Sequence, residues 1–134
     1  MDRRRIRVLL VEDEEIHRVV ARAVLRAAGV EADEAENGAE AVRRVRERVG
    51  GAGAGAYDLI LTDKQMPIMD GHEVYTPATR QIRAMGVTTT IVAVSSDSLP
   101  SDVQAFIAAG ADDFTPKPLT KEKLSHILSK FGLA

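Results

Sequence analysis

Short apolar runs alternate with amphipathic helical patterns along the whole of this 134-residue chain. Strict alternation favours an α/β fold, in which one parallel sheet is covered by helices on both faces, because parallel strands need crossover connections. A chain of this length suits one compact domain with a core of its own. The predicted strands are 6–11, 30–35, 57–62, 89–95 and 111–115.

Apolar residues at helical spacing predict a helix after each strand. Thr76 followed by Pro77 predicts the start of the third helix, as an N-cap with proline in the first turn. Acids interrupt the weak strand at 30–35, which we therefore expect at an exposed edge. The Gly-Ala-rich segment 50–56 is predicted to be a surface loop. The first helix gathers its apolar residues on one face, predicted to meet the core: Ile16, Val19, Val20, Ala23, Val24 and Ala27.

Polar side chains stand where the predicted strands end. Glu12 and Asp13 follow the first strand, and Asp63 follows the third. Ser95 ends the fourth strand, and Lys117 comes just after the fifth. Parallel strands bring these ends to one edge of the sheet, which is where open α/β sheets bind ligands.

Three carboxylates at one edge repel one another unless a cation lies among them. Hard oxygen donors and the absence of cysteine favour Mg²⁺ over zinc. Because a carboxylate can attack phosphorus, Asp63 is predicted to accept a phosphoryl group. Lys117 would contact the phosphoryl oxygens as a point charge, and the Ser95 hydroxyl would donate to them.

The three histidines share no metal-ligand spacing and have no nucleophile beside them in the sequence. We interpret His17, His72 and His126 as surface or structural residues, with His72 a minor candidate for tuning the site.

Several short motifs resemble, in the right order and over nearly the whole chain, the receiver domain of two-component response regulators. They are Val11-Glu12-Asp13-Glu14, Asp63 with Met66-Pro67 and Met69-Asp70-Gly71, Ser95, and Lys117-Pro118. The resemblance implies the flavodoxin-like doubly wound fold, with five parallel strands in the order 2-1-3-4-5. It also implies a phosphorelay role, in which a histidine-containing phosphotransfer protein donates the phosphoryl group.

The same resemblance implies a role for each matching residue. Asp63 would be the phosphoacceptor, and Mg²⁺ would be bound by Asp13, Glu12, Asp63 and the backbone carbonyl of Gln65. Lys117 and Ser95 would be the family's catalytic lysine and switch hydroxyl. The remaining implied features are Phe114 as the switch aromatic, Gln65 and Asp97 as positions that tune phosphoryl lifetime, and a cis bond between Lys117 and Pro118.

More narrowly, the runs 63–67 and 94–96 resemble plant receivers of the cytokinin phosphorelay. Because nothing follows the last predicted helix, we expect residues 1–134 to be a single stand-alone receiver without an output domain, similar to plant type-C response regulators. One departure lies between Gly71 and Arg80, where the chain is longer than the family pattern by about one helical turn.

Two other functions fit the same residues. A Mg²⁺-dependent phosphohydrolase would also use an aspartyl-phosphate, but it normally adds a general acid and a cap domain, and Gln65 is no acid. A receiver that has lost phosphorylation would serve as a binding surface. We expect neither, and we expect no conventional enzyme beyond the phosphorylation and dephosphorylation of Asp63 itself.

Composition restricts partners and location. A net charge of −2 argues against non-specific nucleic-acid binding. No apolar run reaches the length of a membrane span, and Arg3 to Arg5 are not followed by a signal-peptide core. We expect a cytoplasmic location, with the nucleus as a second option, and a monomer or weak dimer.

Overall fold

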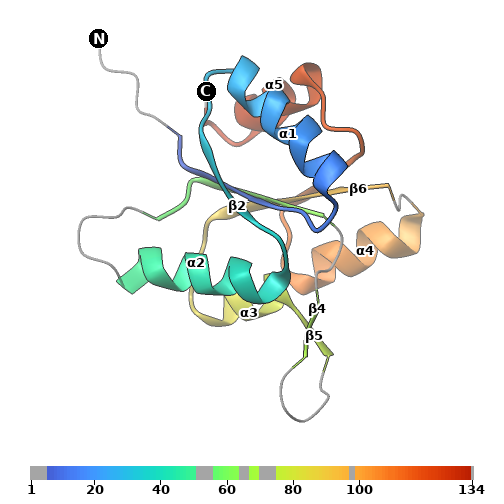
Figure 1. Ribbon diagram of the computed structural model, residues 1–134. Coiled ribbons are helices and arrows are strands. Elements are labelled where there is room, and N and C mark those ends of the chain that lie inside the picture. Colours follow the sequence, from blue (N-terminus) through green and yellow to red (C-terminus); the bar gives the residue numbers. More distant parts are fainter. Residues whose placement is uncertain (1–5, 51–55, 64–66, 70–74, 97–98, 134) are drawn as a thin grey trace.

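Figure 1 shows the computed structural model, which describes residues 6–50, 56–63, 67–69, 75–96 and 99–133. Its central sheet has five parallel strands in the order β2-β1-β3-β6-β7. Counting only these parallel strands, the order is 2-1-3-4-5, which confirms the predicted doubly wound fold. The strands are β1 (Val8–Val11), β2 (Ala32–Ala35), β3 (Leu59–Thr62), β6 (Thr90–Ser95) and β7 (Asp113–Pro116).

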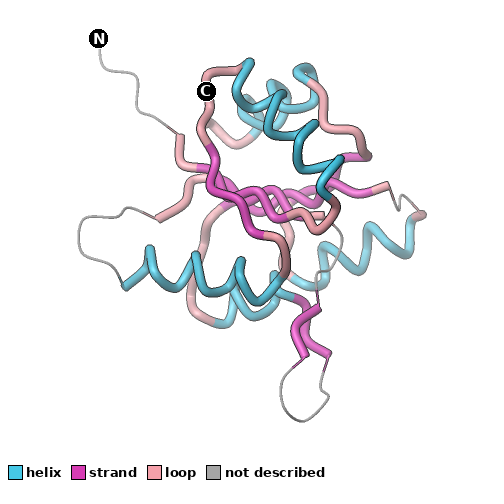
Figure 2. The backbone as a smooth tube through the Cα atoms, in the orientation of Figure 1, coloured by secondary structure: helices cyan, strands magenta, loops and turns pink. Residues whose placement is uncertain are grey.

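Helices cover both faces of the sheet (Figures 1 and 2). On one face lie α1 (Glu15–Ala27) and α5 (Lys121–Lys130). On the other lie α2 (Gly38–Gly50), α3 (Ala78–Ala84) and α4 (Pro100–Ala109). Both central strands β1 and β3 are buried along their whole length, as expected where each sheet face is covered.

Alternate residues of the central strands enter two separate cores. Leu9 and Ile60 pack with the α2, α3 and α4 layer, while Leu10 and Leu61 pack with α1 and α5. This is the two-residue period of a strand, and it lets a continuous apolar run fill both layers. As predicted, β2 lies at an edge, and its side chains are mostly half-buried.

The apolar face predicted for α1 is wrong for all of its residues except Val24, which packs against the core. Ile16, Val19 and Val20 are 77%, 47% and 42% exposed, whereas Ala21 and Leu25 are buried against the sheet and α5. At about 100° per residue, the buried pair lies on the side of the helix opposite to the exposed residues. The helix therefore carries two apolar sides, and only contact with β1 and α5 decides which is inside. The exposed side continues through Ala23 and Ala27.

The helix start predicted at Thr76-Pro77 is also wrong. Strand β4 (Pro67–Met69) pairs antiparallel with β5 (Tyr75–Pro77), and α3 begins only at Ala78. A proline disfavours helical geometry in the residue before it, so Thr76 is extended. The chain's departure from the family pattern thus includes a two-stranded ribbon that is separate from the main sheet and lies next to α2 and α3 (Figure 2). Most of the predicted loop at 50–56 lies outside the described residues.

Arg83 joins α3 to the amino ends of β6 and β7. Its Nε donates to the Gly110 carbonyl at 3.0 Å, and its Nη1 donates to the carbonyls of Val87 and Thr89 at 2.9 and 2.7 Å. Its Nη2 pairs with Asp112 Oδ2 at 2.8 Å. Gly110 has a φ of +115°, and a Cβ there would lie 2.7 Å from Arg83 Cγ, so this close approach requires glycine.

Among the described residues, none of the helices has both the length and the continuous apolar character needed to cross a bilayer.

Candidate functional site

Backbone hydrogen bonds fix three of the predicted site residues at the carboxyl edge of the sheet. The amide of Glu12 donates to the Ala35 carbonyl at 3.0 Å, and the amide of Asp63 donates to the Val11 carbonyl at 2.9 Å. The amide of Lys117 donates to the Ser95 carbonyl at 3.0 Å. Each bond continues the ladder between neighbouring strands by one step, so strand register itself brings the three residues together.

Three carboxylates gather at this edge. One oxygen from each of Glu12, Asp13 and Asp63 lies within 4.8 Å of the other two. Glu12 and Asp63 are each only 4% exposed, whereas Asp13 is exposed to solvent. Hard oxygen donors from a few carboxylates, with one side open to water, are the donor set that Mg²⁺ prefers. The residues present therefore fit this ion.

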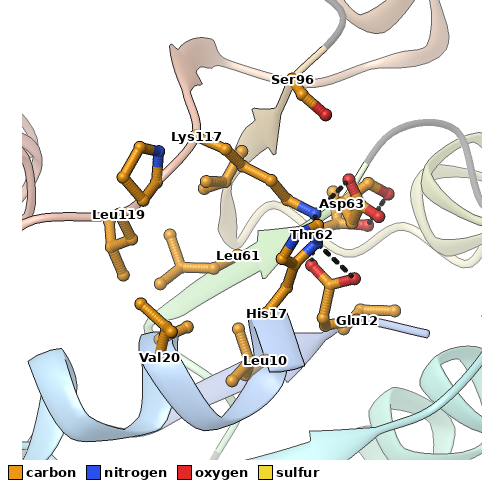
Figure 3. Close-up of a pocket in the computed structure, with 14 residues that line it drawn as sticks. Leu10, Glu12, His17, Val20, Leu61, Thr62, Asp63, Ser96, Lys117 and Leu119 are labelled. Atoms are coloured by element: carbon orange, nitrogen blue, oxygen red, sulfur yellow. Dashed lines mark hydrogen bonds and ion pairs between the residues drawn. The ribbon is translucent and has the colours of Figure 1, made fainter. Parts of the chain in front are cut away.

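Lys117 offsets the repulsion between the two buried acids. Its Nζ lies 2.7 Å from Glu12 Oε2 and 3.1 Å from Asp63 Oδ1 (Figure 3). The lysine side chain is itself only 11% exposed. Unlike charges at these distances in a partly desolvated site attract strongly, so Lys117 is held against both carboxylates.

Burial raises the pKa of Glu12 above its usual value, against the hydrogen bonds from Lys117 and from the Glu14 amide. Burial acts to lower the pKa of Lys117, but its hydrogen bonds to Glu12 and Asp63 outweigh this and raise that pKa. The raised pKa of Glu12 favours a neutral carboxyl, whereas the raised pKa of Lys117 comes from carboxylate partners that are ionised. We take both groups as ionised, because Glu12 Oε2 accepts from Lys117 and Oε1 accepts from the Glu14 amide at 3.1 Å.

The structure brings His17, which was interpreted as a surface or structural residue, to the edge of the site. Its Nδ1 lies 2.8 Å from Lys117 Nζ, and Figure 3 shows the imidazole entering the site from α1. The sequence did contain a hint that His17 lies near the site, because it stands one helical turn after Asp13, in a helix that begins right after the acidic end of the first strand. The spacing of apolar residues does not show which way a histidine side chain is directed.

A cavity of about 220 Å³ opens beside these groups. Glu12, Asp63 and Lys117 contribute polar lining, and apolar side chains such as Val20 and Leu119 form other walls (Figure 3). The charged groups of this edge therefore lie beside low-dielectric walls, where charge–charge interactions are stronger than in water.

Ser95 is buried at the end of β6, with 1% exposure, and the hydroxyl-bearing residues that line the cavity are Thr62 and Ser96. Phe114 is half-buried and stacks on Phe106 with a ring-centroid distance of 5.8 Å. The peptide bond between Lys117 and Pro118 is cis, as the resemblance implied. The positions of Gln65, Asp97 and His72 lie outside the described residues.

Comparison with known proteins agrees with the fold and the site described above. The family model described as "Response regulator receiver domain" matches residues 8–129. The two-component response regulator ORR41 of Oryza sativa subsp. japonica is 68% identical, and the alignment covers all of both chains.

Two solved structures share the fold. One is described as a co-crystal of the Saccharomyces cerevisiae histidine phosphotransfer protein Ypd1 with the receiver domain of Ssk1; it is 28% identical with a TM-score of 0.76, covering 96% of this chain and 89% of the other. The second is the receiver domain of the Pseudomonas aeruginosa PAO1 sensor histidine kinase PA1611, with a magnesium ion coordinated in its active-site cleft. It is 33% identical with a TM-score of 0.74, covering 96% of this chain and 98% of that domain.

The chain has a doubly wound sheet with a cluster of acids and a lysine at its carboxyl edge, and a receiver-domain model matches residues 8–129. The chain therefore belongs to the family of response regulator receiver domains.

Proposed function

We propose that this receiver accepts a phosphoryl group on Asp63 from a phosphohistidine of a histidine-containing phosphotransfer protein, with Mg²⁺ as its cofactor. One observation carries the proposal. Asp63 is a buried carboxylate at the end of a central strand, 3.1 Å from Lys117 and within 4.8 Å of carboxylate oxygens of Glu12 and Asp13. A receiver is a signalling domain rather than a conventional enzyme.

In the proposed reaction, a carboxylate oxygen of Asp63 attacks phosphorus. The new bond joins that oxygen to phosphorus, while the bond from phosphorus to the donor imidazole nitrogen breaks and the electron pair returns to the imidazole. Lys117 stays beside the reacting oxygens, and its ammonium offsets the charge that they carry. Bound by Glu12, Asp13 and Asp63, Mg²⁺ would supply further neutralisation of phosphoryl charge.

The implied roles of Ser95 and Phe114 belong to the same proposal. Ser95 is buried at the strand end beside the site, and Phe114 follows in the neighbouring strand β7. We propose that they transmit phosphorylation of Asp63 to the surface of the domain. The carbonyl of Gln65 as a further metal ligand and the stand-alone organisation of residues 1–134 stay predictions.

The exposed apolar side of α1 supports a protein partner at this edge. Ile16, Val19 and Val20 are exposed aliphatic side chains that lie together on one side of α1, and contiguous exposed apolar surface is typical of protein interaction sites. Val20 also lines the cavity that contains Asp63, so the exposed side of the helix is continuous with the site. We propose that the phosphotransfer protein docks on this side of α1, which would bring its phosphohistidine to Asp63.

Replacing Ile16 with serine is expected to slow transfer from the phosphotransfer protein about tenfold, since burying such a side chain contributes about 1.5 kcal/mol or more. Transfer from a small donor such as phosphoramidate should not change, because no docking is needed. Ile107→Ser on α4, where the isoleucine is 47% exposed, is the matched control. An equal effect of Ile16→Ser on both donors, or no effect on either, would argue against docking on α1.

The central test follows radiolabelled phosphoryl through time, from a phosphorylated phosphotransfer protein to the wild-type chain and to Asp63→Asn. We expect label on the wild type only, and only when Mg²⁺ is present. Label that never leaves the donor would favour the phosphorylation-silent binding surface. Rapid turnover of small phosphate esters, abolished by Asp63→Asn, would favour the phosphohydrolase.

A further inference from the structure

Lys117 has a third partner that the proposed chemistry does not use. Its Nζ contacts Glu12 Oε2, Asp63 Oδ1 and His17 Nδ1, at 2.7, 3.1 and 2.8 Å. An ammonium has three N–H donors, and among the described residues three acceptors lie around it. The histidine comes from the first turns of α1, one hundred positions before the lysine in the chain. Figure 3 shows the three groups meeting around the end of the lysine side chain.

The contact determines the form of the imidazole. An ammonium donates and never accepts, so His17 Nδ1 must offer its lone pair, and the ring proton lies on Nε2. Carboxylate oxygens of Glu14 and Glu12 lie farther from the same nitrogen, at 3.5 and 3.9 Å. If Nδ1 carried a proton, two N–H donors would face each other at 2.8 Å and would repel. The shorter contact therefore assigns His17 as a neutral acceptor for Lys117.

We propose that His17 is a positioning residue for phosphoryl transfer, which rests on the proposed function of Asp63. Glu12 and Asp63 both change partners in that function, as metal ligand and as phosphoacceptor. His17 does neither, so it is the partner that can stay on Lys117 throughout. By holding one of the three donors, the imidazole keeps the flexible lysine side chain above Asp63 and leaves two donors for the reacting oxygens.

The test compares His17→Phe, which keeps a ring but has no acceptor, with His17→Asn, whose Oδ1 can replace Nδ1. We expect His17→Phe to slow labelling of Asp63 about tenfold, a usual effect for a residue that orients a reacting group. His17→Asn should recover most of the rate. The control His126→Phe changes an exposed histidine of α5 and should leave the rate unchanged.

Two donors separate positioning from docking, because His17 lies next to Ile16 on α1. A positioning role predicts equal slowing with the phosphotransfer protein and with phosphoramidate, and an unchanged affinity for the phosphotransfer protein. Slowing with the protein donor alone would overturn the proposal in favour of docking.

A double-mutant cycle and a spectrum complete the test. In a Lys117→Met background, His17→Phe should produce no further loss of rate, since the residue acts through the lysine.

¹⁵N NMR of the wild type should show His17 with its proton on Nε2 and none on Nδ1. Additive rate losses, or a proton found on Nδ1, would refute the inference even if the wild type is labelled on Asp63. Absence of label on the wild type would instead refute the proposed function and leave the spectrum as an independent result.

Discussion

Replacing Lys117 with methionine should slow phosphoryl transfer to Asp63 by about 100-fold or more, the usual cost of removing a donor aimed at developing charge. Nζ of this lysine already lies 3.1 Å from Asp63 Oδ1, so no rearrangement of the backbone is needed for it to meet the phosphoryl group. The rate is measured as label appearing on Asp63 at saturating Mg²⁺ and donor. Lys121→Met, which removes an exposed lysine from the first turn of α5, is the matched control.

The same substitution should also destabilise the metal-free domain by about 3 kcal/mol, because it leaves two buried carboxylates without their cation. Denaturant unfolding with and without Mg²⁺ measures this. The loss should shrink when Mg²⁺ is added, since a bound cation offsets the same repulsion. A Lys117→Met protein that unfolds like wild type in the absence of metal, or that is labelled at the wild-type rate, would contradict the role assigned to the lysine.

Replacing Arg83 with methionine should lower the free energy of unfolding by about 3 kcal/mol and the melting temperature by about 10 °C. The change leaves the carbonyls of Gly110, Val87 and Thr89 without their guanidinium donor and removes the ion pair with Asp112. Arg80→Met, on the exposed side of the same helix, should change stability by less than about 0.5 kcal/mol.

Phosphoryl transfer should nevertheless continue in the folded Arg83→Met protein. Arg83 joins the amino ends of β6 and β7, and Asp63 and Lys117 lie at the carboxyl edge of the sheet. Labelling at a temperature well below the new melting point separates the two effects. A large loss of labelling there would mean that the two edges are coupled through the sheet.

The strand-end residues were predictable because strand order and direction follow from alternation. Once five parallel strands are inferred, Glu12, Asp13, Asp63 and Lys117 must lie at one edge, and the structure has them there. The cap of the last helix is a local contact of the same kind, because Thr120 Oγ1 accepts from the Lys123 amide three residues later. Each of these inferences needs only the direction of the chain or a contact within one turn.

The misassigned positions all depend on packing between distant segments. Ile16 and Leu25 are both aliphatic residues of α1, yet one is 77% exposed and the other 1%. Thr76 and Pro77 have the local character of a helix start, but pairing with β4 places them in a strand. A local sequence pattern predicts whether a segment is a helix or a strand. It does not predict which side of a helix faces the core or which strand pairs with which.

By itself, the sequence determined a doubly wound α/β domain with a carboxylate cluster and a lysine at one edge, because strand direction and order are encoded in the alternation of short apolar runs. Only the tertiary structure decided which side of α1 is buried, that a ribbon precedes α3, and that His17 meets Lys117 across one hundred positions. The physical reason is that a helix is rotated to fit the sheet and its neighbouring helix. That rotation, set by side chains far away in the chain, decides which residues of α1 face the site.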